Sequence, residues 1–256
     1  MAKKRSKKKN DSPIVIFIEM MAIIIVYTII FILGILKLIY NVISFYLSGY
    51  KKKSGNGIFK TFFDKGYKGE FILYKKLIKI FGKEYVFTNL YLDNVNTEKT
   101  EIDVIAISNK KIYVFEMKNY RGHVYGSEKD VHWTQVFNRF SKYKFYNPLR
   151  QNYAHTKALE KYLDVELTNI EPVVVFSNSS KLRKINVNET NNIIQIKDLN
   201  KFIKNSERKH QEIFNLDEKK KYSEKLILTE NVSDEIKKEH IRQVQEHINK
   251  QNYSDN

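Results

Sequence analysis

Acidic side chains and a lysine recur within one apolar stretch of the sequence, EIDVIAISNKKIYVFEMK (101–118). The β-branched and aromatic residues on both sides of Asn109-Lys110 predict two strands joined by a short turn at that point. A turn of two or four residues places Asp103 directly opposite Glu116 on the neighbouring strand. A turn of three residues would shift the register by one position and separate the two carboxylates.

The same register places Glu101 opposite Lys118, so four charged side chains share one face of the sheet: Glu101, Asp103, Glu116 and Lys118. Facing carboxylates repel each other, and a divalent cation relieves that repulsion. Mg²⁺ prefers oxygen ligands, and a lysine beside it can orient or activate water or stabilise charge on a phosphate. In the alternative interpretation these residues are purely structural: Glu101 pairs with Lys118, Asp103 caps a loop and Glu116 lies at an exposed strand end.

A helix before the hairpin is predicted to add one more acid. Apolar residues in the segment 65–81 follow helical spacing, and Glu70 falls on their face, near the N-terminal end where the helix dipole favours a carboxylate. A strand at 84–92 then leads to the hairpin.

The remaining elements complete an α/β pattern. A smaller hairpin is predicted over 122–134, and Pro148 can open a helix that continues to residue 163. Strands are predicted at 171–177 and 192–197. The order of helix, three strands, helix and strand predicts an α/β fold with a mixed sheet.

The N-terminal part has the character of a membrane anchor. Residues 14–36 contain a single charge, Glu19, and as a helix would extend about 34 Å, enough to cross a bilayer core of roughly 30 Å. Apolar character continues past Lys37, either as the end of a longer tilted helix or as an interfacial amphipathic stretch. Basic residues flank both sides nearly equally, so the positive-inside rule does not decide the orientation.

Composition excludes several classes of protein. The 256 residues include no cysteine, which excludes thiol catalysis, disulfide scaffolds and iron–sulfur ligation. The six histidines do not have the spacing of a zinc hydrolase. The formal net charge of +16 suggests phosphate or anionic lipid partners, but residues 1–53 carry ten basic and two acidic residues and hence half of that excess.

Five ordered blocks of the sequence resemble the nuclease-related domain (NERD) family, which is grouped with the PD-(D/E)xK, restriction-endonuclease-like nucleases. The resemblance covers roughly residues 63–180. The blocks are GYKGE (66–70), TEIDVIAIS (100–108), VFEMKNYRGHVYG (114–126), WTQ (133–135) and NPLRQNYAH (147–155). The resemblance implies an α-β-β-β-α-β core with the hairpin at its centre.

The resemblance also implies roles for single residues. Asp103 and Glu116 become ligands of Mg²⁺ or Mn²⁺, Lys118 the catalytic lysine, and Glu70 the helix-borne acid that completes the metal shell. Met117, between the acid and the lysine, is expected in the core on the opposite face. Four further residues are candidates for substrate binding or support of the metal site: Gln135, Gln151, Asn152 and His155.

These interpretations predict a membrane-anchored, metal-dependent nuclease that acts on DNA or RNA, with DNA the favoured prediction for its substrate, and with its nuclease-like domain on the cytoplasmic side of a single-pass helix. A non-catalytic nucleic-acid-binding or membrane-tethering module on the same fold is the alternative, and a membrane scaffold held by anionic lipid is a third.

The basic and aromatic stretch 139–150 is either a strip that binds the nucleic-acid backbone or a solvated loop. We divide the chain into a basic flank (1–12), a transmembrane anchor (13–49), a linker (50–62), the nuclease-like domain (63–200) and a charged helical tail (201–256).

Overall fold

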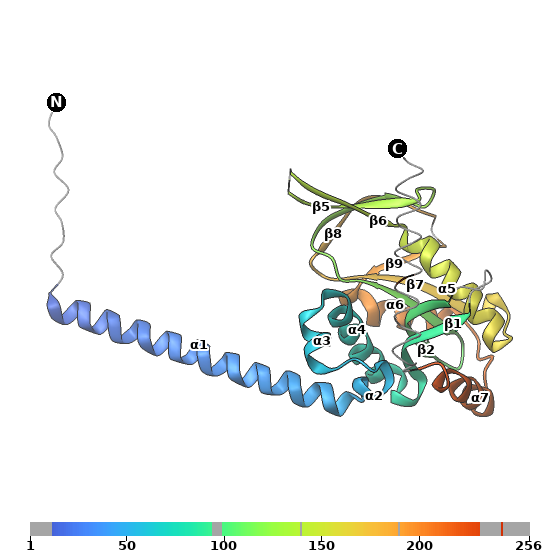
Figure 1. Ribbon diagram of the computed structural model, residues 1–256, viewed down its shortest axis with the longest axis horizontal. Helices are drawn as coiled ribbons and strands as arrows, with labels where there is room; N and C mark the ends of the chain where they lie inside the picture. Colours follow the sequence, from blue (N-terminus) through green and yellow to red (C-terminus); the bar gives the residue numbers. More distant parts are fainter. Residues whose placement is uncertain (1–11, 94–98, 139, 189, 231–241, 243–256) are drawn as a thin grey trace. The chain divides into compact units, whose positions relative to one another are not determined.

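The structure, a computed structural model, describes residues 12–93, 99–138, 140–188, 190–230 and 242 (Figure 1). The chain divides into two compact units, residues 1–47 and 48–256. Arg139 of the basic and aromatic stretch, and residues 231–256 of the expected tail apart from Arg242, lie outside the described residues.

Helix α1 (Pro13–Ser48) is continuous over 36 residues, which correspond to about 54 Å. The apolar residues beyond Lys37 therefore belong to the same helix as the predicted anchor. Within the part of the chain that the structure describes, α1 is the one helix long and apolar enough to cross a membrane.

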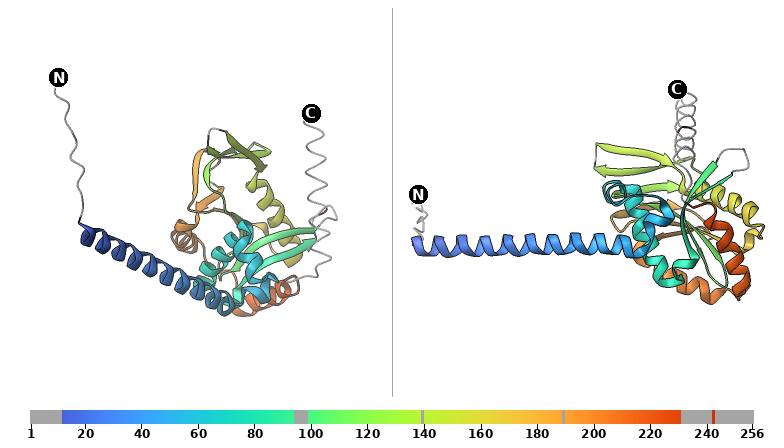
Figure 2. Two further views of the ribbon diagram at one scale, coloured as in Figure 1. Left: turned by 60° about the vertical axis from the view of Figure 1, so that its left-hand side comes forward. Right: turned by 60° about the horizontal axis from the view of Figure 1, so that its bottom comes forward.

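The second unit combines short helices with two mixed sheets (Figures 1 and 2). Its helices are α2 (Tyr50–Ser54), α3 (Ile58–Phe63), α4 (Lys65–Phe81), α5 (Pro148–Leu163), α6 (Leu199–Lys209) and α7 (Leu216–Ile227). Its strands are β1 (Val86–Asp93), β2 (Lys99–Ile107), β3 (Ile112–Lys118), β4 (Gly122–Ser127), β5 (His132–Asn138), β6 (Ser141–Tyr146), β7 (Ile170–Phe176), β8 (Ser180–Asn186) and β9 (Asn192–Gln195). Three-residue 3₁₀ turns lie at Lys83–Tyr85, Leu167–Asn169 and Ile196–Asp198.

The larger sheet has the strand order β1-β2-β3-β7-β9. Strands β1, β2 and β3 are antiparallel neighbours, whereas β7 runs parallel to β3 and β9 parallel to β7. The sequence of elements α4, β1, β2, β3, α5 and β7 confirms the predicted α-β-β-β-α-β core with a mixed sheet. A mixed sheet follows because β3 and β7 are joined by a crossover that contains a helix.

Helices α4 and α5 cover opposite faces of this sheet, as successive side chains of β3 show. Tyr113 packs against Phe81 of α4, while Val114 belongs to the core that Ala158 and Leu159 of α5 complete. Each helix begins where its sequence predicts, because Asp64 caps α4 and Asn147 precedes the proline that opens α5.

The smaller sheet has the order β6-β5-β4-β8. Its central hairpin, β4 and β5, agrees with the hairpin predicted over 122–134. Strands β6 and β8 were not predicted, because both are rich in lysine and lack a strict apolar alternation. The inner face of this sheet packs on β7 through Trp133 and Phe176, whose rings are stacked.

The second unit is larger than the sequence-based boundaries suggested. Residues 50–62, expected as a linker, form α2 and α3, and Tyr50 is fully buried. Residues 201–230, expected as part of a tail, contain most of α6 and all of α7, whose Ile203 and Leu226 are buried.

Candidate active site

The end of α4 that carries Glu70 lies against the end of β3 because Gly69 has no side chain. A Cβ at Gly69 would lie 2.6 Å from the Cβ of Asn119 and 3.2 Å from the Cγ of Met117. Any other residue would push the helix away from the strand. The glycine of the GYKGE block therefore brings the Glu70 carboxylate next to the acids of the hairpin.

The predicted hairpin register is confirmed over the apolar part of the hairpin. Val104 faces Phe115 and Ile107 faces Ile112, as a two-residue turn requires. Beyond Val104 the ladder gives way to a side-chain contact: the Asp103 carboxylate oxygen Oδ2 accepts a hydrogen bond of 2.7 Å from the Met117 backbone N–H. Asp103 is thereby fixed at the point where β2 and β3 separate.

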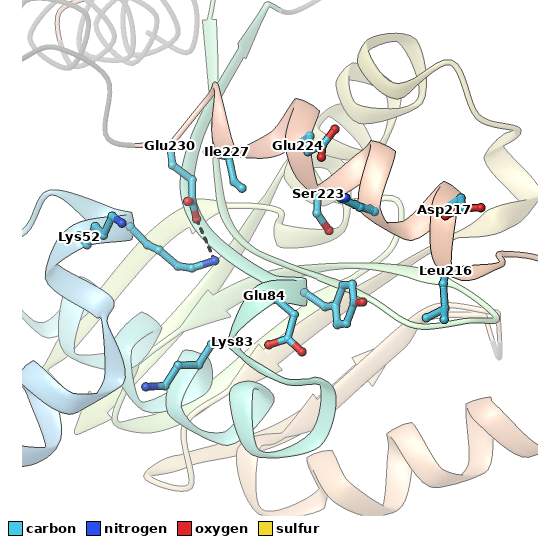
Figure 3. Close-up of a pocket in the computed structure, with 12 residues that line it drawn as sticks. Lys52, Lys83, Glu84, Leu216, Asp217, Ser223, Glu224, Ile227 and Glu230 are labelled. Atoms are coloured by element: carbon cyan, nitrogen blue, oxygen red, sulfur yellow. Dashed lines mark ion pairs between the residues drawn. The ribbon is translucent and has the colours of Figure 1, made fainter.

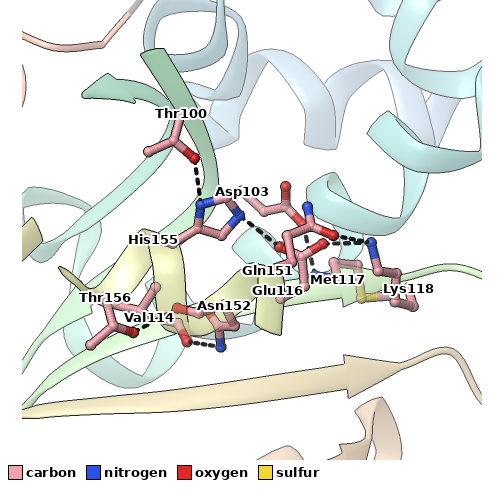
Figure 4. A network of polar contacts seen from close by, with 10 residues as sticks. All are labelled: Thr100, Asp103, Val114, Glu116, Met117, Lys118, Gln151, Asn152, His155 and Thr156. Carbon is pink, nitrogen blue, oxygen red and sulfur yellow. Dashed lines mark hydrogen bonds and ion pairs between the residues drawn. The ribbon is translucent and has the colours of Figure 1, made fainter. Parts of the chain in front are cut away.

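Glu116 lies at the centre of a polar network on the α5 side of the sheet (Figure 4). Its Oε1 pairs with Lys118 Nζ at 2.6 Å, and its Oε2 lies 3.1 Å from His155 Nε2. The other ring nitrogen of His155, Nδ1, lies 2.7 Å from Thr100 Oγ1. Because a carboxylate can only accept, Nε2 carries the proton, and in a neutral ring the Thr100 hydroxyl donates to Nδ1.

The candidate support residues occupy different places. Gln151 Oε1 accepts a hydrogen bond of 3.0 Å from Lys118 Nζ, and His155 holds Glu116 as described. Asn152 is buried and donates to the Val114 carbonyl at 3.0 Å, which makes it a link between α5 and β3. Gln135 lines the same pocket as Glu116 and Lys118, and its amide donates to the Arg121 carbonyl at 2.7 Å.

Burial sets the electrostatics of the acids. Burial and the neighbouring Glu101 raise the pKa of Glu70 to about 8. Burial, together with Glu116 and Glu70, raises the pKa of Asp103 well above its usual range. Two carboxyls in this pocket therefore bind protons more tightly than in water, which is the effect expected of like charges gathered away from solvent.

The ion pair has the opposite effect on its two members. Burial opposes ionisation of both groups, but Lys118 and His155 hold the pKa of Glu116 below its ordinary value. Glu116 in turn raises the pKa of Lys118 above its ordinary value, against the effect of burial. Lys118 is thus a protonated, hydrogen-bond-donating group at neutral pH.

The contacts of Glu101 differ from the predicted register. Glu101 does not pair with Lys118; its Oε1 accepts from Asn89 Nδ2 at 3.1 Å, and the same amide donates to Glu70 Oε2 at 3.0 Å. Asn89 has a φ of 54°, a left-handed conformation that asparagine tolerates better than most residues. This local left-handed conformation inside β1 places the Asn89 amide between the carboxylates of Glu70 and Glu101. No local sequence pattern predicts this conformation.

The acids Glu70, Asp103 and Glu116 and the ammonium group of Lys118 line one pocket of about 380 Å³. Its lining includes Glu70, Asp103, Glu116, Lys118 and Gln151 from the network, together with Lys65, Gly66, Met117, Asn119, Tyr120, Arg121, Gln135 and Phe137. The sequence-predicted acids and lysine therefore meet in one cavity, although they come from α4, β2 and β3.

The donor set fits a hard divalent cation in part. Asp103 and Glu116 offer oxygen ligands only, and Mg²⁺ is commonly held by one or two carboxylates with water and substrate phosphates. Among the described residues, however, no three of the types His, Cys, Asp and Glu are gathered closely enough to hold a metal ion together. Glu70 accepts the Asn89 hydrogen bond through Oε2, so Oε1 is the oxygen through which it could act as a third ligand.

A second cavity, of about 950 Å³, lies between α2, α7 and the turn before β1 (Figure 3). It shares no lining residue with the acid–lysine pocket. The partly buried pair Lys53–Glu230, 3.7 Å apart, closes one side, and Lys53 also donates to the Val86 carbonyl at 2.6 Å. Lysines and acids are equally represented in the lining, so its charge selects no class of ligand.

The order of helix, three strands, helix and strand, with acids and a lysine where β2 and β3 separate, defines a nuclease-like mixed α/β fold. The nuclease-related domain family matches residues 65–177. The uncharacterized protein pXO1-01 of Bacillus anthracis is 32% identical over 190 residues, which cover 73% of this chain and 87% of that protein. The chain belongs to the nuclease-related domain (NERD) family.

Among solved structures, the crystal structure of AF1548, a protein of unknown function, is similar with a TM-score of 0.32 and 16% identity. The similarity covers 52% of this chain and 58% of AF1548. The chain therefore spans less than two thirds of that protein.

Proposed function

We propose that this protein is a membrane-anchored nuclease that needs Mg²⁺ or Mn²⁺ and hydrolyses phosphodiester bonds, those of DNA in preference to RNA. The observation that carries the proposal is the single pocket in which Asp103, Glu116, Lys118 and Glu70 meet. The preference for DNA rests on the resemblance to restriction-endonuclease-like enzymes.

Four residues of the pocket have tasks in this proposal. Asp103 and Glu116 would hold the metal ion, which when bound supplies Lewis-acid stabilisation of the phosphate. Lys118 is protonated, so it donates hydrogen bonds to the attacking water or to a phosphate oxygen and does not act as a base. Gln151 and Glu116 fix its ammonium group from two sides.

A cleavage assay tests this proposal. The full chain in detergent is expected to nick plasmid DNA with Mg²⁺ or Mn²⁺ and to lose this activity in EDTA, with a matched RNA substrate as the comparison. Lys118→Ala and Asp103→Ala are each expected to reduce cleavage to background, because they remove the ammonium donor and a metal ligand. Lys161→Ala, at an exposed position of α5, is the matched control. Equal rates for wild type and Lys118→Ala would overturn the catalytic assignment.

One observation favours a second candidate function, a nucleic-acid-binding or tethering module without turnover. Glu116 is already engaged by Lys118 and His155, and the described acids do not form a ready-made metal cluster. In that case, salt-sensitive binding of nucleic acid would survive Asp103→Ala and would not require a metal. The same variants therefore decide between the two functions.

We propose further that residues 14–36 of α1 cross the membrane once and that the nuclease-like domain faces the cytoplasm, where nucleic acid and magnesium are present. The supporting observation is the length and apolar character of α1. A reporter that is fluorescent only in the cytoplasm, fused to the C-terminus, is expected to be fluorescent in whole cells. Activity of a periplasmic reporter at the same position would reverse the orientation.

A further inference from the structure

The inner face of the β5–β6 hairpin continues from the protein core to the rim of the pocket. Along β5, Trp133 and Gln135 share this face, because side chains alternate along a strand. Phe137 follows at a register shift between Val136 and Asn138, and its ring contacts that of Tyr143. On β6, Phe145 faces Trp133 and Tyr143 faces Gln135. Trp133 and Phe145 pack in the core with Phe176, so the first part of this face has an ordinary structural role.

The end of this face that carries Phe137 and Tyr143 lies outside the core. Phe137 and Tyr143 are 42% and 59% exposed, and their rings lie 5.7 Å apart in an edge-to-face arrangement. Phe137 lines the pocket that contains Glu116 and Lys118. Exposed apolar side chains gathered beside a charged pocket can form part of a ligand-binding surface.

The charges around this pair complement a polynucleotide. The pocket lining adds Arg121 and Lys65 near its opening, and its acids are the three carboxylates already described. Cationic side chains that follow a phosphate backbone, together with aromatic rings on which bases stack, are the features of sites for single-stranded nucleic acid. A base within a duplex has both of its faces covered by neighbouring base pairs, so only an unpaired base can use such rings.

We propose that Phe137 and Tyr143 form a stacking site for an unpaired nucleotide next to the bond that the pocket cleaves. The substrate class is then nucleic acid that exposes an unpaired nucleotide, either a single strand or a locally opened stretch of a duplex such as a supercoiled plasmid. This inference rests on the proposed nuclease function for its biological meaning, but the stacking site itself can be tested by binding alone.

The test measures binding by the full chain in detergent, with Lys118→Ala present throughout so that cleavage does not interfere. The probes are a fluorescein-labelled single-stranded DNA of about 20 nucleotides and the blunt duplex of the same sequence, followed by fluorescence anisotropy. Phe137→Leu and Tyr143→Leu, which keep apolar bulk but remove the ring, are each expected to weaken binding of the single strand about 5- to 100-fold. Binding of the duplex is expected to change less than about twofold, because duplex affinity comes mainly from phosphate contacts.

Matched controls separate stacking from a general effect on the hairpin. Tyr143→Phe keeps the ring and is expected to bind like the parent protein. Tyr146→Leu changes an aromatic residue with 43% exposure on the opposite face of β6, opposite His132, and is expected to leave single-strand binding unchanged. An equal loss for single strand and duplex, no loss in either ring variant, or an equal loss in Tyr146→Leu would overturn the inference.

Failure of this inference can be told apart from failure of the proposed function. If the protein with Lys118 intact cleaves DNA while Phe137→Leu binds the single strand normally, the stacking site is refuted and the nuclease remains. If Phe137→Leu loses single-strand binding while the protein with Lys118 intact cleaves neither DNA nor RNA, the stacking site stands and catalysis is refuted.

Discussion

Glu116→Ala is expected to abolish metal-dependent cleavage and to lower the free energy of unfolding by about 3–5 kcal/mol. Glu116 is almost fully buried, and its two oxygens hold Lys118 Nζ at 2.6 Å and His155 Nε2 at 3.1 Å. Its removal takes away a proposed metal ligand and leaves the largely buried ammonium of Lys118 with the amide oxygen of Gln151 as its remaining hydrogen-bond acceptor. An uncompensated buried charge costs far more than the loss of a salt bridge at the surface.

The double variant Glu116→Leu/Lys118→Met distinguishes the two effects. It removes both charges and replaces them with apolar side chains, so it is expected to recover most of the lost stability without recovering cleavage. The protein's single tryptophan, Trp133, is buried and reports unfolding in urea by its fluorescence. If the double variant were as unstable as Glu116→Ala, the buried charge of Lys118 would not be the cause.

The parts of the site that sequence analysis placed correctly depend on local geometry. The register from Val104 to Phe115 follows from turn length and strand alternation, and Met117 lies on the opposite face from Glu116 for the same reason. The position of Glu70 on the inward face of α4 follows from helical spacing. Each of these rules connects residues that are near in sequence.

The parts that it missed depend on distant segments or on a local break of the regular pattern. The predicted Glu101–Lys118 contact extended the strand ladder past the point where Asp103 takes a backbone partner. Asn89 reaches two acids only because its backbone is left-handed within a strand. Residues 50–62 were read as a linker because their polar lysines gave no sign that Tyr50 and Lys53 are held by α4 and β1.

Glu70 is expected to make the metal-free protein less stable as the pH rises from about 5 to 8. Its pKa in the folded protein is raised to about 8 by burial and by Glu101, whereas in the unfolded chain an ordinary glutamate ionises near pH 4.3. Between these two values the folded state holds a proton that the unfolded state has released. The free energy of unfolding therefore falls by up to about 1.4 kcal/mol for each pH unit in this range and levels off above pH 8.

Glu70→Gln tests this origin because glutamine keeps the shape and cannot ionise. Urea unfolding in EDTA is expected to show a slope smaller by about 1.4 kcal/mol per pH unit in this variant, while Asp103, whose pKa is also raised, keeps a remaining slope. Glu212→Gln, at an exposed position, is expected to keep the full slope. An unchanged slope in Glu70→Gln would mean that Glu70 is not the group that couples folding to pH.

Saturating Mg²⁺ is expected to raise the free energy of unfolding of the wild type by about 2.7 kcal/mol at 100 times its Kd. This stabilisation is expected to be largest at pH 8, where the carboxylates that Mg²⁺ would neutralise are most ionised.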